Sequence, residues 1–181
     1  RAISVRWPWV RAALLVNLAS EVAIVVTGGL VRVTGSGLGC PTWPECVPGS
    51  FTPVVEQAEG YHKYIEFGNR TLTFVLGVAA IAVLVGVYTV FRRVTLGGAA
   101  PLLLVIAQAV LGGITVRMTL SPETVAAHLL LSMVTIAVST WLWLRITPER
   151  VAGTAPDEGV ALPPLTRPLA YALAAESAVV L

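Results

Sequence analysis

Four long apolar windows alternate with shorter polar segments along the chain. They cover Ala12–Val31, Thr71–Phe91, Thr95–Val116 and Val125–Leu144. Each window has about the 20 residues that a helix needs to cross the hydrocarbon core of a bilayer. Glu21 and His128 are the charge-bearing side chains inside them. The pattern therefore predicts four transmembrane helices.

Arginines mark one side of these windows. Most of them precede the first window, lie between the second and third, or follow the fourth: Arg1, Arg6, Arg11, Arg92, Arg93, Arg145, Arg150 and Arg167. Arginine-rich connections stay on the cytoplasmic side of a membrane. We therefore expect a cytoplasmic amino terminus, and we expect the loop 32–70 to be extracytoplasmic.

The segment after the fourth window changes in character. Residues 145–168 contain five prolines together with Asp157, Glu158 and Gly159, a composition typical of a linker. Residues 169–181 are apolar again but too few to cross a bilayer. We therefore predict an all-α membrane protein with a four-helix bundle over 1–144, a cytoplasmic linker, and the truncated start of a fifth helix.

Composition agrees with this class. The chain of 181 residues is 56% hydrophobic and 12% charged, and its mean hydropathy is +0.81. Soluble domains carry about 25% charged residues. The net charge of +2 is small and scattered, which argues against binding to nucleic acid.

Two cysteines, Cys40 and Cys46, enclose Pro-Thr-Trp-Pro-Glu in the long loop. A cysteine pair on the extracytoplasmic side is expected to form a disulfide. The pair is either a structural link within the loop or a redox-active dithiol, and the residues leave both alternatives open.

A second polar group lies where the long loop enters the second window. If the helix already begins at His62, then His62, Glu66 and Asn69 share one stripe, and Arg70 follows Glu66 by one turn. A carboxylate at the mouth of a bundle can serve proton transfer. The alternative is an interfacial Glu66–Arg70 ion pair, which contributes only a few tenths of a kcal/mol.

His128 and Glu21 are costly inside apolar helices unless they have partners. His128 lies one turn into the fourth window, and either a haem iron or a neighbouring helix would satisfy its imidazole. Glu21 lies near the centre of the first window. It requires a partner such as Asn17, four residues earlier, or a neutral protonated state.

Three segments together resemble bacterial haem A synthases. They are the run TGGLVRVTGSGLGCPTWPEC at 27–46, the run IEFGNR at 65–70, and His128 at the start of the fourth window. The first run is long and specific, and the resemblance covers essentially the whole chain. It implies the amino-terminal half of an eight-helix protein built from two similar four-helix bundles.

The resemblance implies oxidation of a methyl group of haem O to the formyl group of haem A. It implies Glu66 as the catalytic acid, and His128 as a ligand of the haem iron. Asn69 and Arg70 join His128 as residues that bind the haem, and Cys40–Cys46 is the disulfide of the loop. A haem b cofactor is expected in the missing carboxy-terminal half. The implied partners are the lipid bilayer of the bacterial cell membrane, haem O synthase and an extracytoplasmic thiol reductant.

The chain departs from the family at Asn69, where the pattern commonly has a second haem-ligand histidine. This places ligation by two histidines in doubt. Two other functions compete with haem oxidation. One is a membrane thiol–quinone oxidoreductase that uses Cys40 and Cys46, and the other is a non-catalytic haem-binding assembly subunit that uses His128 only for binding.

Overall fold

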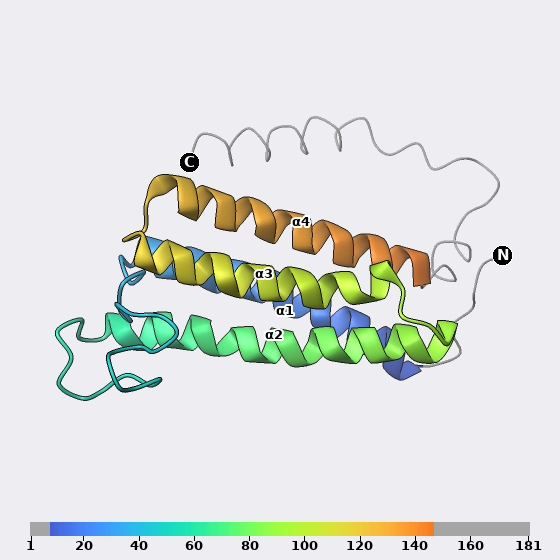
Figure 1. Ribbon diagram of the computed structural model, residues 1–181, viewed down its shortest axis with the longest axis horizontal. Helices are drawn as coiled ribbons and strands as arrows, with labels where there is room; N and C mark the ends of the chain where they lie inside the picture. Colours follow the sequence, from blue (N-terminus) through green and yellow to red (C-terminus); the bar gives the residue numbers. More distant parts are fainter. Residues whose placement is uncertain (1–7, 147–181) are drawn as a thin grey trace.

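The computed structural model describes residues 8–146, which form four long helices (Figure 1). They are α1 (Pro8–Val33), α2 (His62–Phe91), α3 (Leu96–Arg117) and α4 (Pro122–Ile146). All four are long and apolar enough to cross a membrane. The prediction of an all-α, multi-pass membrane protein is confirmed. The predicted fifth helix, 169–181, and the linker after Ile146 lie outside the described residues.

Helices α1, α2 and α4 extend beyond their predicted windows, and α2 does so most, whereas α3 is shifted by one residue. Helix α2 begins at His62, nine residues before Thr71, so the loop between α1 and α2 spans only residues 34–61 rather than 32–70. The extra turns carry Lys63, Glu66 and Arg70, whose polar groups bond to the loop. An apolar window underestimates a helix whose polar outer turns are paired with protein rather than with lipid.

The four helices form a closed ring in which each packs against two neighbours. The packed pairs are α1–α2, α2–α3, α3–α4 and α1–α4, which places α2 and α4 at opposite corners (Figure 1). Helices α2 and α3 approach closely, because a Cβ at Gly98 would lie 2.6 Å from Val87 Cγ1. Thr95 caps α3 by accepting a hydrogen bond from the N–H of Gly98 at 3.1 Å.

The buried apolar core is concentrated at the end of the bundle away from the long loop. One cluster joins three helices there: Val10, Leu14, Val83, Val87, Leu142 and Ile146. A smaller cluster of Leu76, Ala80 and Val105 lies between α2 and α3. Large apolar side chains such as Val26, Phe74 and Leu130 remain exposed on the outside of the helices, as expected for a surface that faces lipid.

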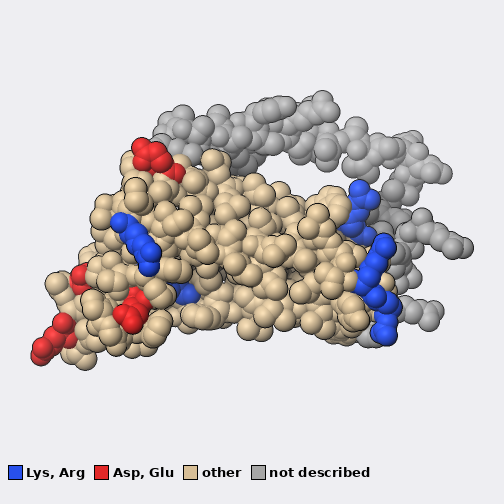
Figure 2. Space-filling view, in the orientation of Figure 1, with Lys and Arg blue, Asp and Glu red and all other residues tan. Residues whose placement is uncertain are grey.

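Charge divides the two ends of the molecule. Acidic side chains gather at the end with the long loop, and basic side chains gather mostly at the other end (Figure 2). Arg11, Arg92, Arg93 and Arg145 belong to the basic end within the described residues. The four other arginines of the predicted cytoplasmic set lie outside them.

Candidate functional site

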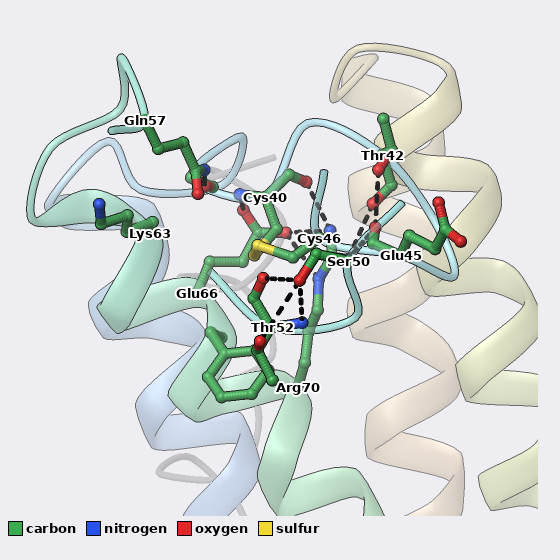
Figure 3. The surroundings of a disulfide bond; sticks show 12 residues. Cys40, Thr42, Glu45, Cys46, Ser50, Thr52, Gln57, Lys63, Glu66 and Arg70 are labelled. Atoms are coloured by element: carbon green, nitrogen blue, oxygen red, sulfur yellow. Dashed lines mark hydrogen bonds and ion pairs between the residues drawn. A yellow bond between two sulfur atoms is a disulfide. The ribbon is translucent and has the colours of Figure 1, made fainter. Parts of the chain in front are cut away.

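Glu66 is buried at the end of the bundle that carries the long loop, which we call the outer end. It lies one turn into α2 and is only 5% exposed. Its Oε2 accepts a hydrogen bond from the N–H of Cys40 at 2.7 Å, and its Oε1 accepts one from Arg70 Nε at 3.0 Å (Figure 3). The ion pair that the sequence allows is present, but Glu66 also holds the loop. Its carboxylate is therefore fixed in orientation by groups from two segments.

Arg70 connects this carboxylate to the loop. Besides Glu66, its guanidinium donates hydrogen bonds to the carbonyl oxygens of Cys40 at 2.6 Å, Thr42 at 2.8 Å and Glu45 at 3.4 Å. A planar guanidinium has five N–H donors in a fixed fork, which suits several carbonyls at once. The family resemblance implies that Arg70 binds haem, and this stays a prediction; in the structure its guanidinium donates to Glu66 and to the backbone of the loop.

The predicted disulfide is present between Cys40 and Cys46, and both cysteines are almost fully buried. The loop packs tightly on the start of α2, because a Cβ at Gly39 would collide with the backbone carbonyl of His62. Lys63 of α2 also holds this loop, because its Nζ donates hydrogen bonds to the carbonyls of Val54 and Val55. The disulfide is thus one of several connections that hold this segment.

His62 and Asn69 share a stripe with Glu66, as predicted, but each has a separate partner. His62 Nδ1 lies 2.8 Å from the hydroxyl of Ser36, which is fully buried. Asn69 Oδ1 accepts a hydrogen bond of 2.7 Å from Thr27 and so joins α2 to α1. The two residues are therefore used at different depths of the bundle.

His128 lies in the second turn of α4. Its ring packs against α3, where a Cβ at Gly112 would be 3.2 Å from the ring carbon Cε1. The Nδ1 atom is buried and has no hydrogen-bond partner. The structure therefore shows no hydrogen bond from this nitrogen to a neighbouring described helix. An imidazole nitrogen that is buried and unpaired is chemically suited to an iron ligand.

The structure gathers some predicted residues and separates others. Glu66, Arg70 and the disulfide form one bonded group at the end of α2, whereas His128 lies on α4 at the opposite corner of the helix ring. Asn69 and His128 are seven and six residues from the outer ends of their helices. Both are therefore about 10 Å inside the bundle along the helix axes.

Sequence reasoning missed Trp43 as a site residue. A Cβ at Gly113 would lie 2.5 Å from Trp43 Cδ2, and the Arg117 guanidinium lies 5.7 Å from the centre of the Trp43 ring. The Trp43 side chain thus packs the disulfide loop against α3. The glycine pair at 112–113 was the available signal, since a large ring can approach a helix closely only where side chains are absent.

These features define a class: a multi-pass helical membrane protein with a paired carboxylate, a disulfide loop and a free imidazole at one end of its bundle. The chain belongs to the COX15-CtaA family of cytochrome oxidase assembly proteins, whose family model matches residues 11–181.

Curated relatives carry the name heme A synthase. The chain is 30% identical over 153 residues to that of Geobacillus thermodenitrificans, which covers 77% of this chain and 45% of the relative. It is 26% identical over 155 residues to that of Shewanella oneidensis, covering 78% of this chain and 47% of the relative. The chain therefore spans about half the length of these relatives. No solved structure matches it.

Proposed function

We propose that this chain is the amino-terminal bundle of a haem A synthase, which oxidises a methyl group of haem O to a formyl group. The observation that carries the proposal is the buried, unpartnered Nδ1 of His128 beside Gly112. The family and the names of the relatives supply the identity of the reaction.

His128 is the residue that would hold the iron of the substrate haem. An apolar helix tolerates an imidazole only when the ring nitrogens are satisfied, and within the described residues Nδ1 has no protein partner. Because Gly112 has no side chain, the imidazole ring can lie directly against α3. Asn69 lies at a similar depth on the opposite helix, so we place it along the other face of the haem.

Glu66 is the residue that we assign to catalysis. A carboxylate can stabilise positive charge that develops at the methyl carbon, or it can accept the proton that leaves it. Cys40 and Arg70 each use part of its hydrogen-bonding capacity, but two carboxylate oxygens offer about four lone-pair positions. Three hydrogen bonds, one from Cys40 to Oε2 and two from Arg70 to Oε1, fix the orientation of the acid, so the lone pair left for the substrate is on Oε2.

The rest of the machinery belongs to the longer protein. A haem b cofactor would be held by a second bundle, with the protein in a bacterial cell membrane and its amino terminus in the cytoplasm. Haem O synthase would supply the substrate. An extracytoplasmic thiol reductant would reach the Cys40–Cys46 disulfide only after the loop opens, because both cysteines are almost fully buried.

A second candidate is a non-catalytic subunit that binds haem during oxidase assembly, which the description of the family as cytochrome oxidase assembly proteins favours. The thiol–quinone oxidoreductase is the weaker candidate. Cys40 and Cys46 are 0% and 1% exposed, and a partner thiol must reach a sulfur atom directly.

The test is extraction and identification of haem from the full-length protein, purified from cells that make haem O. Haem A or its hydroxylated intermediate is expected in the wild type, and His128→Ala should lose most of the haem bound to the amino-terminal bundle. A protein that carries haem b alone and never yields a formyl product would instead be an assembly subunit.

A further inference from the structure

Glu21 lies in the middle of α1, far from the residues used above, and is almost fully buried. Its Oε1 accepts hydrogen bonds from Asn17 Nδ2 at 2.8 Å and from the Ser139 hydroxyl at 2.6 Å. Asn17 Nδ2 also donates to Ser139 Oγ at 3.2 Å, which closes a three-residue cluster between α1 and α4. The three side chains are 1%, 2% and 3% exposed for Asn17, Glu21 and Ser139.

Two oxygen atoms of this cluster remain unpaired. Glu21 Oε2 and Asn17 Oδ1 are buried and have no hydrogen-bond partner. Both are acceptors when the carboxylate is ionised, so neither can satisfy the other. Unpaired polar atoms are expensive in a membrane interior. A proton on Oε2 removes the negative charge, which is the most expensive part of this unpaired group in a membrane interior.

The same conclusion holds if the Asn17 amide is reversed. The carbonyl oxygen Oδ1 would then occupy the position that lies 2.8 Å from Glu21 Oε1. Two acceptors at that separation again require a hydrogen atom between them. The need for a proton therefore does not depend on how the amide is oriented.

No cation adjacent to Glu21 is available from the described helices to balance an ionised carboxylate. On α1, Arg11 and Arg32 are ten and eleven residues from Glu21, about 15 Å or more along the axis. On α4, Arg145 and His128 are six and eleven residues from Ser139.

The other two helices also place their charges away from Glu21. The basic residues of α2 and α3 are Lys63, Arg70 and Arg117, all near the outer ends of their helices, where His62 and Glu66 also lie. The remaining ionisable side chains of these helices are Tyr64, Tyr88 and Glu123.

We propose that Asn17, Glu21 and Ser139 form a proton-binding site inside the membrane, at which Glu21 is a neutral carboxylic acid at neutral pH. The buried apolar cluster that contains Val10, Leu14 and Leu142 lies between this site and the arginine-rich end. On its outer side, Gly28 follows Glu21 by seven residues and so lies on the same face of α1. The site thus lies between this apolar cluster and the end of the bundle that carries the proposed haem ligands. The proposal does not depend on the haem chemistry.

Infrared spectroscopy of the full chain in lipid bilayers at neutral pH tests this directly. The wild type should show the carbonyl stretch of a protonated carboxylic acid, Glu21→Gln should remove it, and Glu66→Gln should keep it. Ser139→Ala should move the band to higher frequency, because the carbonyl oxygen Oε1 loses one of its two hydrogen bonds.

Two results would overturn the proposal. The first is that no carboxylic acid band of the wild-type spectrum disappears in Glu21→Gln. This result is expected if Glu21 is ionised and binds a cation such as Na⁺. The other is a band whose position does not change in Ser139→Ala. This second measurement keeps the proposal testable if Glu21→Gln fails to fold, and circular dichroism reports folding of each variant.

Discussion

Individual polar side chains in this bundle are distinguished by whether protein groups satisfy them. Glu66 has partners on both oxygens, His62 is bonded to Ser36, and Asn69 accepts from Thr27. His128 differs because its buried Nδ1 has none. Among the residues that the family resemblance assigns to the site, His128 is therefore the one with a costly unpaired nitrogen, and an imidazole nitrogen can bind iron.

Haem bound to the amino-terminal bundle should therefore have one protein ligand. Asn69 offers an amide, which is a poor iron ligand, and His62 is seven residues away, about 10 Å along the helix. We expect electron paramagnetic resonance of the haem-loaded protein to show a high-spin component that His128→Ala removes and His62→Ala leaves. A purely low-spin signal that both variants abolish equally would show that His62 supplies a second ligand.

The space beside His128 should matter as much as the imidazole itself. A Cβ at Gly112 would already lie 3.2 Å from the ring, so Gly112→Val should displace the imidazole and reduce haem content severalfold. Gly77→Val is the matched control, because nothing lies within 4 Å of a Cβ at Gly77. Haem per protein, measured from absorption spectra, separates the two. Equal haem content in both variants would contradict the assigned position of the ring.

Glu66→Gln should abolish the formyl product while haem binding is largely retained. The amide keeps the shape of the side chain but removes the charge, and one of its two ends would face a donor from Cys40 or Arg70. Haem extracted from membranes that contain the variant gives the measurement. Wild-type amounts of haem A would exclude a catalytic role for this carboxylate.

At the scale of elements, the loop 34–61 is held mainly by side chains of α2. Arg70 donates to the carbonyls of Cys40 and Thr42, Glu66 accepts from the N–H of Cys40, and Lys63 donates to Val54 and Val55. Buried hydrogen bonds to charged groups each contribute about 1.5–3 kcal/mol. The loop therefore has several connections that do not depend on its disulfide.

The double variant Cys40→Ser, Cys46→Ser should accordingly retain measurable haem A formation, because the α2 contacts still position the loop. Gly39→Ala should be more damaging, since its Cβ would collide with the backbone of His62 and neither segment can move away easily. Gly68→Ala, which meets nothing within 4 Å, is the control. Complete loss of product in a folded, abundant double-serine variant would mean that the thiols are chemically required.

At the scale of the whole molecule, the separation of basic and acidic ends predicts an orientation in the membrane. Val94 lies in the short connection between α2 and α3 at the basic end, and Val55 lies in the long loop at the other end; both are well exposed. The two native cysteines are paired with each other, so an introduced cysteine would be the only free thiol of the described residues.

A membrane-impermeant thiol reagent should therefore label Val55→Cys in intact cells and should label Val94→Cys only after the membrane is opened. The physical reason is that arginine-rich connections remain in the cytoplasm. Non-reducing electrophoresis of a peptide digest would check that the Cys40–Cys46 pair is undisturbed in both variants. The reverse labelling pattern would place the haem end of the bundle in the cytoplasm.

The sequence by itself determined the elements and their class. Length and apolarity predicted four spanning helices, because a bilayer leaves a helix few alternatives, and the i to i+4 spacing predicted the Glu66–Arg70 pair and the Asn17–Glu21 contact. The motif at 27–46 indicated the family. These inferences depend on neighbours in the chain or on the solvent, both of which can be read from a single sequence.

Only the tertiary structure decided which distant residues meet. Glu66 and Cys40 are 26 residues apart, and Glu21 and Ser139 are 118 apart. Apolar windows say nothing about rotation of one helix against another, and rotation selects the partner of each polar group. That is why the isolated nitrogen of His128 and the contacts of Ser139 with Glu21 and Asn17 follow from the packing and from no local pattern. The glycine pair at 112–113 indicates a close approach, but only the packing shows that Trp43 makes it.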